Sequence, residues 1–224
     1  MKKESELIRF LKRHRSGLIV CALVGEMVVS PAADYHPHFG AILAAFIWLV
    51  IILAARYMAA RRLVRWVVLP IAALWAIARL LEAFGGPDHF YGRLAPVMGF
   101  ALSCALVWGI IERTRVVPRT PIEAIAESFI AYLIIAIAFA QLYWILNQEL
   151  ATPFNQVIPR YEISTLLYFS LVTIASVGYG GIAPVNPYVR MVAAFEGVAG
   201  IFYVAIVVAR LVSAYGGADR RPPE

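Results

Sequence analysis

Long apolar segments alternate with short polar ones along the chain, and this pattern predicts membrane-spanning helices. An α-helix needs about 17–25 apolar residues to cross the ~30 Å core of a bilayer. Six segments fit this length, at residues 17–33, 40–60, 63–84, 94–111, 121–146 and 186–215. A further apolar stretch at 163–175 is too short to span and predicts a re-entrant half-helix. The expected fold is an all-α membrane protein with six transmembrane helices.

Composition supports a membrane protein, since 62% of the residues are hydrophobic and only 15% are charged. A soluble domain has no interior for so much apolar surface. Cys21 and Cys104 fall inside apolar segments, so we expect buried free thiols rather than a disulfide. The net charge of +6 comes without a basic stripe interleaved with aromatic residues, which argues against a nucleic-acid partner.

The basic residues predict the orientation of the chain. They concentrate in the N-terminal segment, the 56–65 region, the 113–119 connector and the C-terminal end. The exceptions are Arg79, Arg93, Arg160 and Arg190. Because basic residues favour the cytoplasmic side, we expect both termini in the cytoplasm and the chain in the plasma membrane. Anionic lipids would meet the basic inner loops.

The N-terminal residues 1–16 leave two alternatives open. Apolar and basic residues interleave there, which is typical of an amphipathic helix on an anionic leaflet, but a disordered basic tail has the same composition. A signal peptide cleaved near residues 30–32 is a third alternative. The long basic head and Glu26 inside the apolar run argue against cleavage.

The stretch 166–184 ends in a glycine-spaced pentapeptide, Ser176-Val177-Gly178-Tyr179-Gly180. Gly178 and Gly180 can adopt a positive φ at little steric cost, so the backbone can alternate in handedness and point successive carbonyls to one side. Oxygens arranged in this way can replace the water shell of an ion. We expect the Tyr179 ring to point away from the ion path and pack behind the loop.

The pentapeptide resembles the pore loop of potassium channels, T-V-G-Y-G, which is usually followed by Asp. Here serine replaces threonine, and Gly181 replaces the aspartate. The segments 188–190 and 209–212, with Glu196 and Gly200 between them, resemble the inner helix of small bacterial two-helix pores. The resemblance covers residues 121–215 and reaches no part of 1–115.

The resemblance implies a selectivity filter in which K⁺ is held by carbonyls of Ser176, Val177, Gly178 and Tyr179 and by the Ser176 hydroxyl. Four chains are needed to surround an ion, so it implies a homotetramer in a lipid bilayer. It implies no cofactor apart from K⁺ ions in the filter, and no enzyme activity.

Further positions take expected roles from the same resemblance. Gly200 corresponds to a hinge glycine, although close helix packing explains it equally well. Thr173 and Glu196 are candidates for pore support. Glu196 is expected to hydrogen-bond behind the filter, with an ion-binding role as the alternative. Gly181 and Val172 lack the acidic brace of some family members, which predicts a filter sensitive to low external potassium.

The first four spans lack the basic repeat of a voltage sensor, because residues 94–111 carry no charge. The predicted organisation is a basic segment (1–16), a four-helix domain (17–112), a linker (113–120), a pore domain (121–215) and a tail (216–224). Within the four-helix domain, Arg79 is expected to pair with Glu26 or Glu82. Zinc binding or pH sensing at the outer side rests on a small set of loop residues: Asp34, His36, His38, Asp88 and His89.

Passive potassium conduction through a homotetrameric pore, without steep voltage gating, is therefore the expected function. A non-selective cation channel and a non-conducting modulatory subunit are the alternatives. A membrane enzyme or proton-coupled carrier would need ionisable groups clustered at membrane depth, whereas all four histidines lie outside the expected spans.

Overall fold

The structure is a computed structural model, and it describes residues 6–35, 62–85, 90–116, 121–159 and 162–216. These residues form helices and connecting loops, with one isolated β-bridge between Phe154 and Pro184. The helices are α1 (Glu6–Tyr35), α3 (Arg62–Gly85), α4 (Phe90–Val116), α5 (Pro121–Glu149), α6 (Ile163–Ile174) and α7 (Pro187–Gly216). The span expected at 40–60 lies outside the described residues.

Three of the described helices contain stretches that are long and apolar enough to cross a membrane: Arg93–Ile111, Ile122–Glu149 and Pro187–Arg210. Shorter apolar stretches lie at Ser16–Ala32, Val68–Ala78 and Ile163–Ile174. The described residues are thus all-helical, with three candidate membrane-spanning helices, and the full count of six spans stays a prediction.

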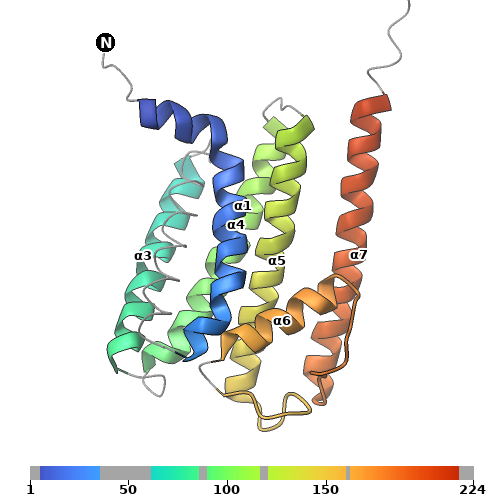
Figure 1. Cartoon of the computed structure of the whole chain (residues 1–224). Helices are drawn as coiled ribbons and strands as arrows, with labels where there is room; N and C mark the ends of the chain where they lie inside the picture. The colour runs from blue at the N-terminus through green and yellow to red at the C-terminus, as the bar shows by residue number, and fades with distance from the viewer. Residues whose placement is uncertain (1–5, 36–61, 86–89, 117–120, 160–161, 217–224) are drawn as a thin grey trace, which may run out of the picture.

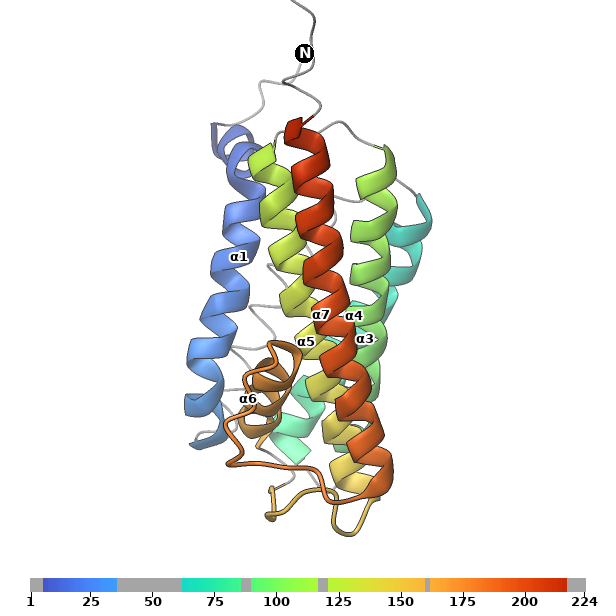
Figure 2. The ribbon, with the colours of Figure 1, turned by 90° about the vertical axis from the view of Figure 1, so that its right-hand side faces the viewer.

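Helix α5 is central to the bundle. It packs against α1, α4, α6 and α7, while α3 packs on α4, and α6 lies against α1 and α7 (Figures 1 and 2). The first turns of α1 and the last turns of α7 lie at one end of the bundle, and the loops flanking α6 lie at the other (Figure 1). The basic N-terminal turns of α1 and the loops that flank α6 therefore lie at opposite ends of the helix bundle.

Two separate cores hold the helices together. The larger core joins α1, α3, α4 and α5 through buried apolar side chains that include Ile19, Leu23, Val68, Trp75, Leu102, Leu106, Ile130 and Ile134. The smaller core lies around α6 and contains Tyr143, Trp144, Phe154, Ile158, Leu166, Phe169, Ile182 and Val189. In a bilayer such contacts stabilise mainly by van der Waals packing, since lipid is as apolar as the side chains.

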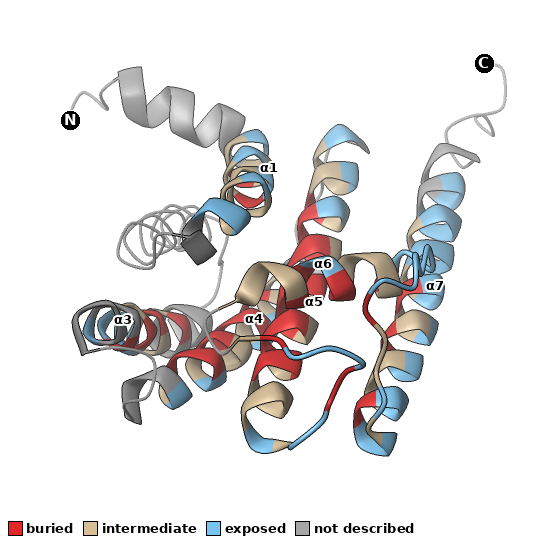
Figure 3. Cartoon of the chain, turned by 60° about the horizontal axis from the view of Figure 1, so that its bottom comes forward, coloured by how far each residue is buried: buried red, intermediate tan, exposed pale blue. Residues whose placement is uncertain are grey.

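Helix α7 is much less covered than its neighbours, and pale blue exposed residues follow most of its length (Figure 3). Arg190 and Arg210 are exposed on it, but most of its exposed side chains are apolar, and the large ones are Tyr188, Met191, Phe195, Val198, Ile201, Phe202, Val204, Ile206, Val208 and Val212. A helix with this composition and so little cover within its own chain has its remaining contacts with lipid or with further protein.

The helix boundaries refine two expectations. Residues 6–16 are helical and continuous with the first apolar segment, and α1 runs on to Tyr35 although Pro31 lies inside it. The thiols of Cys21 and Cys104 are free, as expected, but both residues are exposed, so the expectation of burial was wrong. Hydropathy marks a residue as suited to the membrane interior, but it does not separate a lipid-facing position from a protein-facing one.

The contact between α4 and α5 yields a prediction at Gly99. A Cβ added there would overlap the side-chain amide of Gln141 on α5. We expect Gly99→Leu to destabilise the protein by about 1–3 kcal/mol, as overpacking does in cores. Gly25→Leu is the matched control, because a Cβ at Gly25 meets nothing within 4 Å. Thermal unfolding in detergent measures both, and equal melting temperatures would contradict the assignment of Gly99 as a close-packing position.

Candidate functional site

The loop that follows α6 is held by the last turn of that helix. The helix is apolar and ends at Ile174, within one residue of the expected 163–175 segment. At ~1.5 Å per residue its 12 residues span about 18 Å, well short of a bilayer core. Its terminal carbonyls are free of intrahelical partners, so the next residues can use them.

The backbone N–H groups after α6 turn back onto that helix end. Ser176 N donates to the Thr173 carbonyl at 2.9 Å. Val177 N and Gly178 N both donate to the Val172 carbonyl, at 2.8 and 3.1 Å. The first three amides of the loop therefore point back into α6. No backbone N–H of the described residues bonds to a carbonyl of residues 176–180.

Positive φ occurs at every second residue of the loop. The values are 56° at Ser176, 55° at Gly178 and 83° at Gly180. The two glycines behave as expected, since they enter this region without a Cβ clash. Ser176 was not expected there, and this backbone conformation costs a non-glycine residue about 1–2 kcal/mol. The positive φ expected for the two glycines is thus confirmed, and the direction of the carbonyls stays a prediction.

The Tyr179 ring attaches the loop to α6 by a side-chain contact. It stacks on Tyr168 of α6, with centroids 6.5 Å apart and planes only 5° from parallel. Both rings are exposed on the single chain, Tyr179 by 75%. The expectation that Tyr179 points away from the ion path and packs behind the loop stays a prediction, since the ring has this one contact on the single chain.

Glu196 of α7 is fully buried and joins three helices. The Tyr143 hydroxyl of α5 donates to its Oε2 at 2.7 Å, and Ser170 Oγ of α6 lies 2.5 Å from its Oε1. The same Oγ lies 2.7 Å from the Ala136 carbonyl of α5. The expected hydrogen bonding of Glu196 behind the loop is confirmed, although the sequence did not identify these partners.

An aromatic cluster surrounds this network. The rings of Tyr143, Phe154 and Phe169 meet edge to face, with centroid distances between 4.9 and 6.0 Å. Such pairs add about 0.5–1.5 kcal/mol each beyond burial. The cluster fixes Tyr143, whose hydroxyl holds Glu196, and Phe169, whose carbonyl accepts a 2.7 Å bond from Thr173 Oγ1. Thr173 thus supports the loop through its main chain, because its hydroxyl bonds within α6.

Gly200 lies where α7 touches the end of α6. A Cβ at Gly200 would overlap the Ile174 carbonyl, whereas one at Gly197 would make an ordinary 3.8 Å contact with the Thr173 carbonyl. Of the two explanations for this glycine, the structure supplies direct evidence for close packing. Tyr203 adds a second tie further along α7, since its hydroxyl donates to the Ser128 carbonyl of α5 at 2.7 Å.

The loop before α6 is joined to the chain that leaves the glycine-spaced loop. Asn155 N donates to the Ala183 carbonyl, and Ala183 N donates to Asn155 Oδ1, both at 2.9 Å. Val185 N donates to the Pro153 carbonyl at 3.0 Å. Gly181 has no acidic side chain that could brace the loop. Asn155, in the loop before α6, instead holds the chain at Ala183 by its side-chain oxygen. The sequence analysis missed Asn155, whose only signal was an amide side chain in a polar loop.

Helix α7 begins immediately after this brace. The Asn186 side-chain oxygen accepts from Tyr188 N at 2.9 Å, and Pro187 occupies the first helical position. Both features are typical of helix starts, because the asparagine caps a free N–H and proline lacks one.

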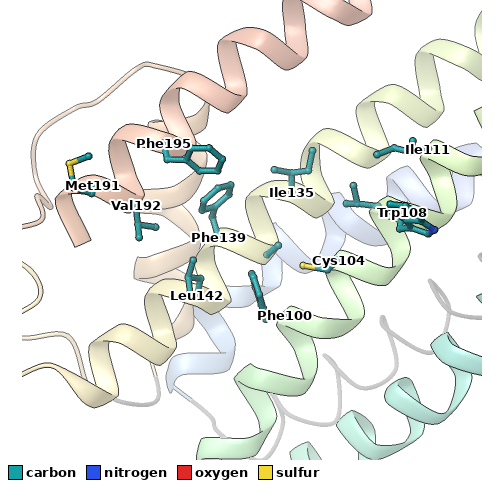
Figure 4. A pocket seen from close by; sticks show the side chains of 12 residues that line it. Phe100, Cys104, Trp108, Ile111, Ile135, Phe139, Leu142, Met191, Val192 and Phe195 are labelled. Atoms are coloured by element: carbon teal, nitrogen blue, oxygen red, sulfur yellow. The ribbon is translucent and has the colours of Figure 1, made fainter. Parts of the chain in front are cut away.

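A separate pocket lies between α4, α5 and α7 (Figure 4). Its volume is about 570 Å³, and its lining includes Phe100, Trp108, Phe139, Met191 and Phe195. Carbon atoms dominate the lining, so the pocket offers nothing that replaces the water of an ion. The glycine-spaced loop is therefore the candidate site for ion chemistry.

Several expected site residues lie beyond what the structure describes. The side chains of Arg79 and Glu82 are outside the described set, so their pairing with Glu26 stays a prediction. His36, His38, Asp88, His89 and the Asp34 side chain are also outside it. Within the part that is described, no group of three or more metal-ligating side chains is present.

Comparison with protein families finds one similarity, in the second half of the chain. Residues 127–216 match the model of a family described as ion channel, which is somewhat less than half of the 224 residues. This segment contains α6, the glycine-spaced loop and α7, and it is similar to an ion channel domain. A search of curated proteins and a search of solved structures each gave no match.

Close packing at Gly200 predicts an asymmetric response of two neighbouring glycines. We expect Gly200→Ala to push α7 from the Ile174 carbonyl and destabilise the domain by about 1–3 kcal/mol. Gly197→Ala is the control on the same helix, because its methyl group fits. Thermal unfolding and ion flux in liposomes give the comparison. If both variants had the melting temperature and ion flux of the unaltered protein, close packing would not explain the glycine at position 200, and helix bending would be the remaining explanation.

The hydrogen bond between Asn155 and Ala183 predicts that a change at Asn155 weakens the glycine-spaced loop. Asn155→Ala removes the acceptor of Ala183 N, at a cost of about 1 kcal/mol, or roughly fivefold in an equilibrium between intact and collapsed loops. We expect the variant to lose current faster than the unaltered protein when external potassium is lowered. Gln156→Ala, at the exposed neighbouring position, is the control. If the current of Asn155→Ala decayed at the same rate as that of the unaltered protein, Asn155 would not brace the loop.

Proposed function

We propose that the chain forms a potassium-selective channel that conducts passively as a homotetramer. The observation that carries the proposal is the ribbon of residues 176–180, with alternating positive φ and carbonyls that accept no backbone hydrogen bond from the described residues. Such carbonyls suit a cation that gives up its water, and rings of them occur in potassium filters.

The proposed tetramer is supported by the fact that one chain cannot surround an ion. One ribbon presents oxygens from one side only, whereas a dehydrated ion needs them all round. The apolar side chains exposed along α7 and the exposed rings of Tyr168 and Tyr179 give further surface that an assembly would cover. In the proposed pore, α7 lines the inner cavity, and Ile201 to Val208 form its apolar inner half.

The arrangement of the ends supports the proposed orientation in the plasma membrane. The loops around α6 lie at one end of the bundle, opposite the start of α1 and the end of α7 (Figure 1). With basic residues on the cytoplasmic side, the filter would open to the outside. Helix α4 carries no charge from Leu94 to Ile111, so we propose that the first four helices stabilise or modulate the pore without sensing voltage.

Reversal potentials in liposomes with potassium and sodium on opposite sides test this function. We expect the reversal potential to follow the potassium gradient. Gly178→Ala should abolish selective current, because alanine disfavours the φ of 55° by about 1–2 kcal/mol in each of four copies. Gly181→Ala is the control, since that residue has no positive φ and its Cβ would meet open space.

Each alternative function gives a distinct result in this experiment. A reversal potential near zero would indicate a non-selective cation channel. Assembly without current in the unaltered protein would indicate a modulatory subunit. Either result would overturn the proposal.

A further inference from the structure

Three oxygen–oxygen contacts of hydrogen-bond length surround Glu196, but the hydroxyl groups of Tyr143 and Ser170 carry only two protons between them. Ser170 Oγ lies 2.7 Å from the Ala136 carbonyl oxygen and 2.5 Å from Glu196 Oε1. A serine hydroxyl carries one proton, and a backbone carbonyl can only accept. An ionised carboxylate also only accepts. One of the two contacts would then join two oxygens with no proton between them.

A proton on Glu196 resolves this conflict. Glu196 Oε1 then donates to Ser170 Oγ, and Ser170 donates its own proton to the Ala136 carbonyl. Tyr143 continues to donate to Oε2. Every proton has an acceptor, and no contact is left without one. An ionised Glu196 would instead leave one of these close oxygen pairs without a proton between them, and it would place an unpaired charge in the protein interior.

The surroundings of Glu196 supply no opposite charge. The titratable groups that face it are the phenols of Tyr143 and Tyr132, both on α5. On α6 the titratable residue is Tyr168, which stacks on Tyr179 instead. On α7, Arg190 and Arg210 are exposed. None of the described basic side chains forms an ion pair with Glu196, and phenols stay neutral below pH about 10.

The position of this proton couples α7 to the filter. Glu196 lies one turn before Gly200, where α7 contacts the Ile174 carbonyl. Its partner Ser170 lies in α6, two residues before the Val172 carbonyl that holds the amides of Val177 and Gly178. A change at Glu196 therefore acts on the α6–α7 contact from which the filter ribbon departs.

We propose that Glu196 is a positioning residue held as a neutral carboxylic acid, and that its proton fastens the inner helix α7 to the pore helix α6. Loss of the proton at alkaline pH places a negative charge against Ser170 Oγ, separates α6 from α7 and disturbs the filter. The effect on conduction rests on the proposed channel function, whereas the protonation state does not.

Infrared spectroscopy of the full chain in liposomes tests the protonation directly. At neutral pH we expect the carbonyl stretch of a protonated carboxylic acid in the unaltered protein and its loss in Glu196→Gln. Glu127→Gln is the matched control, because Glu127 is also a fully buried glutamate, and this change should leave the Glu196 band in place. A carboxylate signal at Glu196 would overturn the proposal whether or not the protein conducts.

Potassium flux between pH 6 and about 9.5, with equal pH on both sides, tests the coupling. We expect flux to fall toward alkaline pH in the unaltered protein and to stay flat in Glu196→Gln, whose amide can donate to Ser170 and accept from Tyr143. Tyr143→Phe removes a donor that favours the carboxylate, so the fall should move to higher pH. Ser103→Ala, which removes a buried serine hydroxyl of α4, should behave as the unaltered protein.

The outcomes separate this proposal from the proposed function. One outcome is potassium-selective flux that does not depend on pH, together with the infrared band of protonated Glu196. This outcome would overturn the coupling between the Glu196 proton and conduction, and it would leave the channel function intact. Flux that falls equally in Glu196→Gln would also overturn the coupling. If the unaltered protein passes no potassium, the channel function fails, and the infrared measurement still decides the state of Glu196.

Discussion

The hydrogen bonds from Val177 N and Gly178 N to the Val172 carbonyl are the constraint on which the shape of the glycine-spaced loop depends. They direct these two amides back into α6 and use a carbonyl that the end of α6 leaves unpaired. Beyond these amides, positive φ at every second residue alternates the handedness of the backbone from Ser176 to Gly180. A short helix thus does more than place a loop, since its last turn also decides which polar groups of that loop remain available.

The rest of the domain keeps the end of α6 in place. From behind, α5 and α7 hold α6 through the Glu196 network, the aromatic cluster and the close approach at Gly200. From the outer end, the strand-like pairing of Asn155 with Ala183 limits how far the chain can move after it leaves the ribbon. These supports come from segments before and after the ribbon, so distortion of the loop must disturb several packed elements at once. Packed interiors resist small displacements, which makes such a frame stiff.

The sequence was most informative where the physics is local. The length of α6 follows from one short apolar run, and positive φ at Gly178 and Gly180 follows from the absence of a Cβ. Ser176 also has a positive φ because the alternation of the backbone requires it. Serine has no intrinsic preference for this conformation, so the sequence did not predict it. The partners of Glu196 lie 26 and 53 residues away, and no periodicity relates such positions. Exposure of Cys21 and Cys104 was also unpredictable, because lipid and protein interiors select the same apolar residues.

The unpaired carbonyls of residues 176–180 have a consequence for how the protein is made. Hydrocarbon offers them no hydrogen-bond donor, and each polar group left bare at membrane depth costs several kcal/mol. Helix α7, with its apolar surface, can rest against lipid in a newly inserted chain without such a penalty. The two parts of one domain therefore mature under different conditions. The helices can settle as soon as they enter the bilayer, while the ribbon reaches its final shape only where water, ions or other chains surround it.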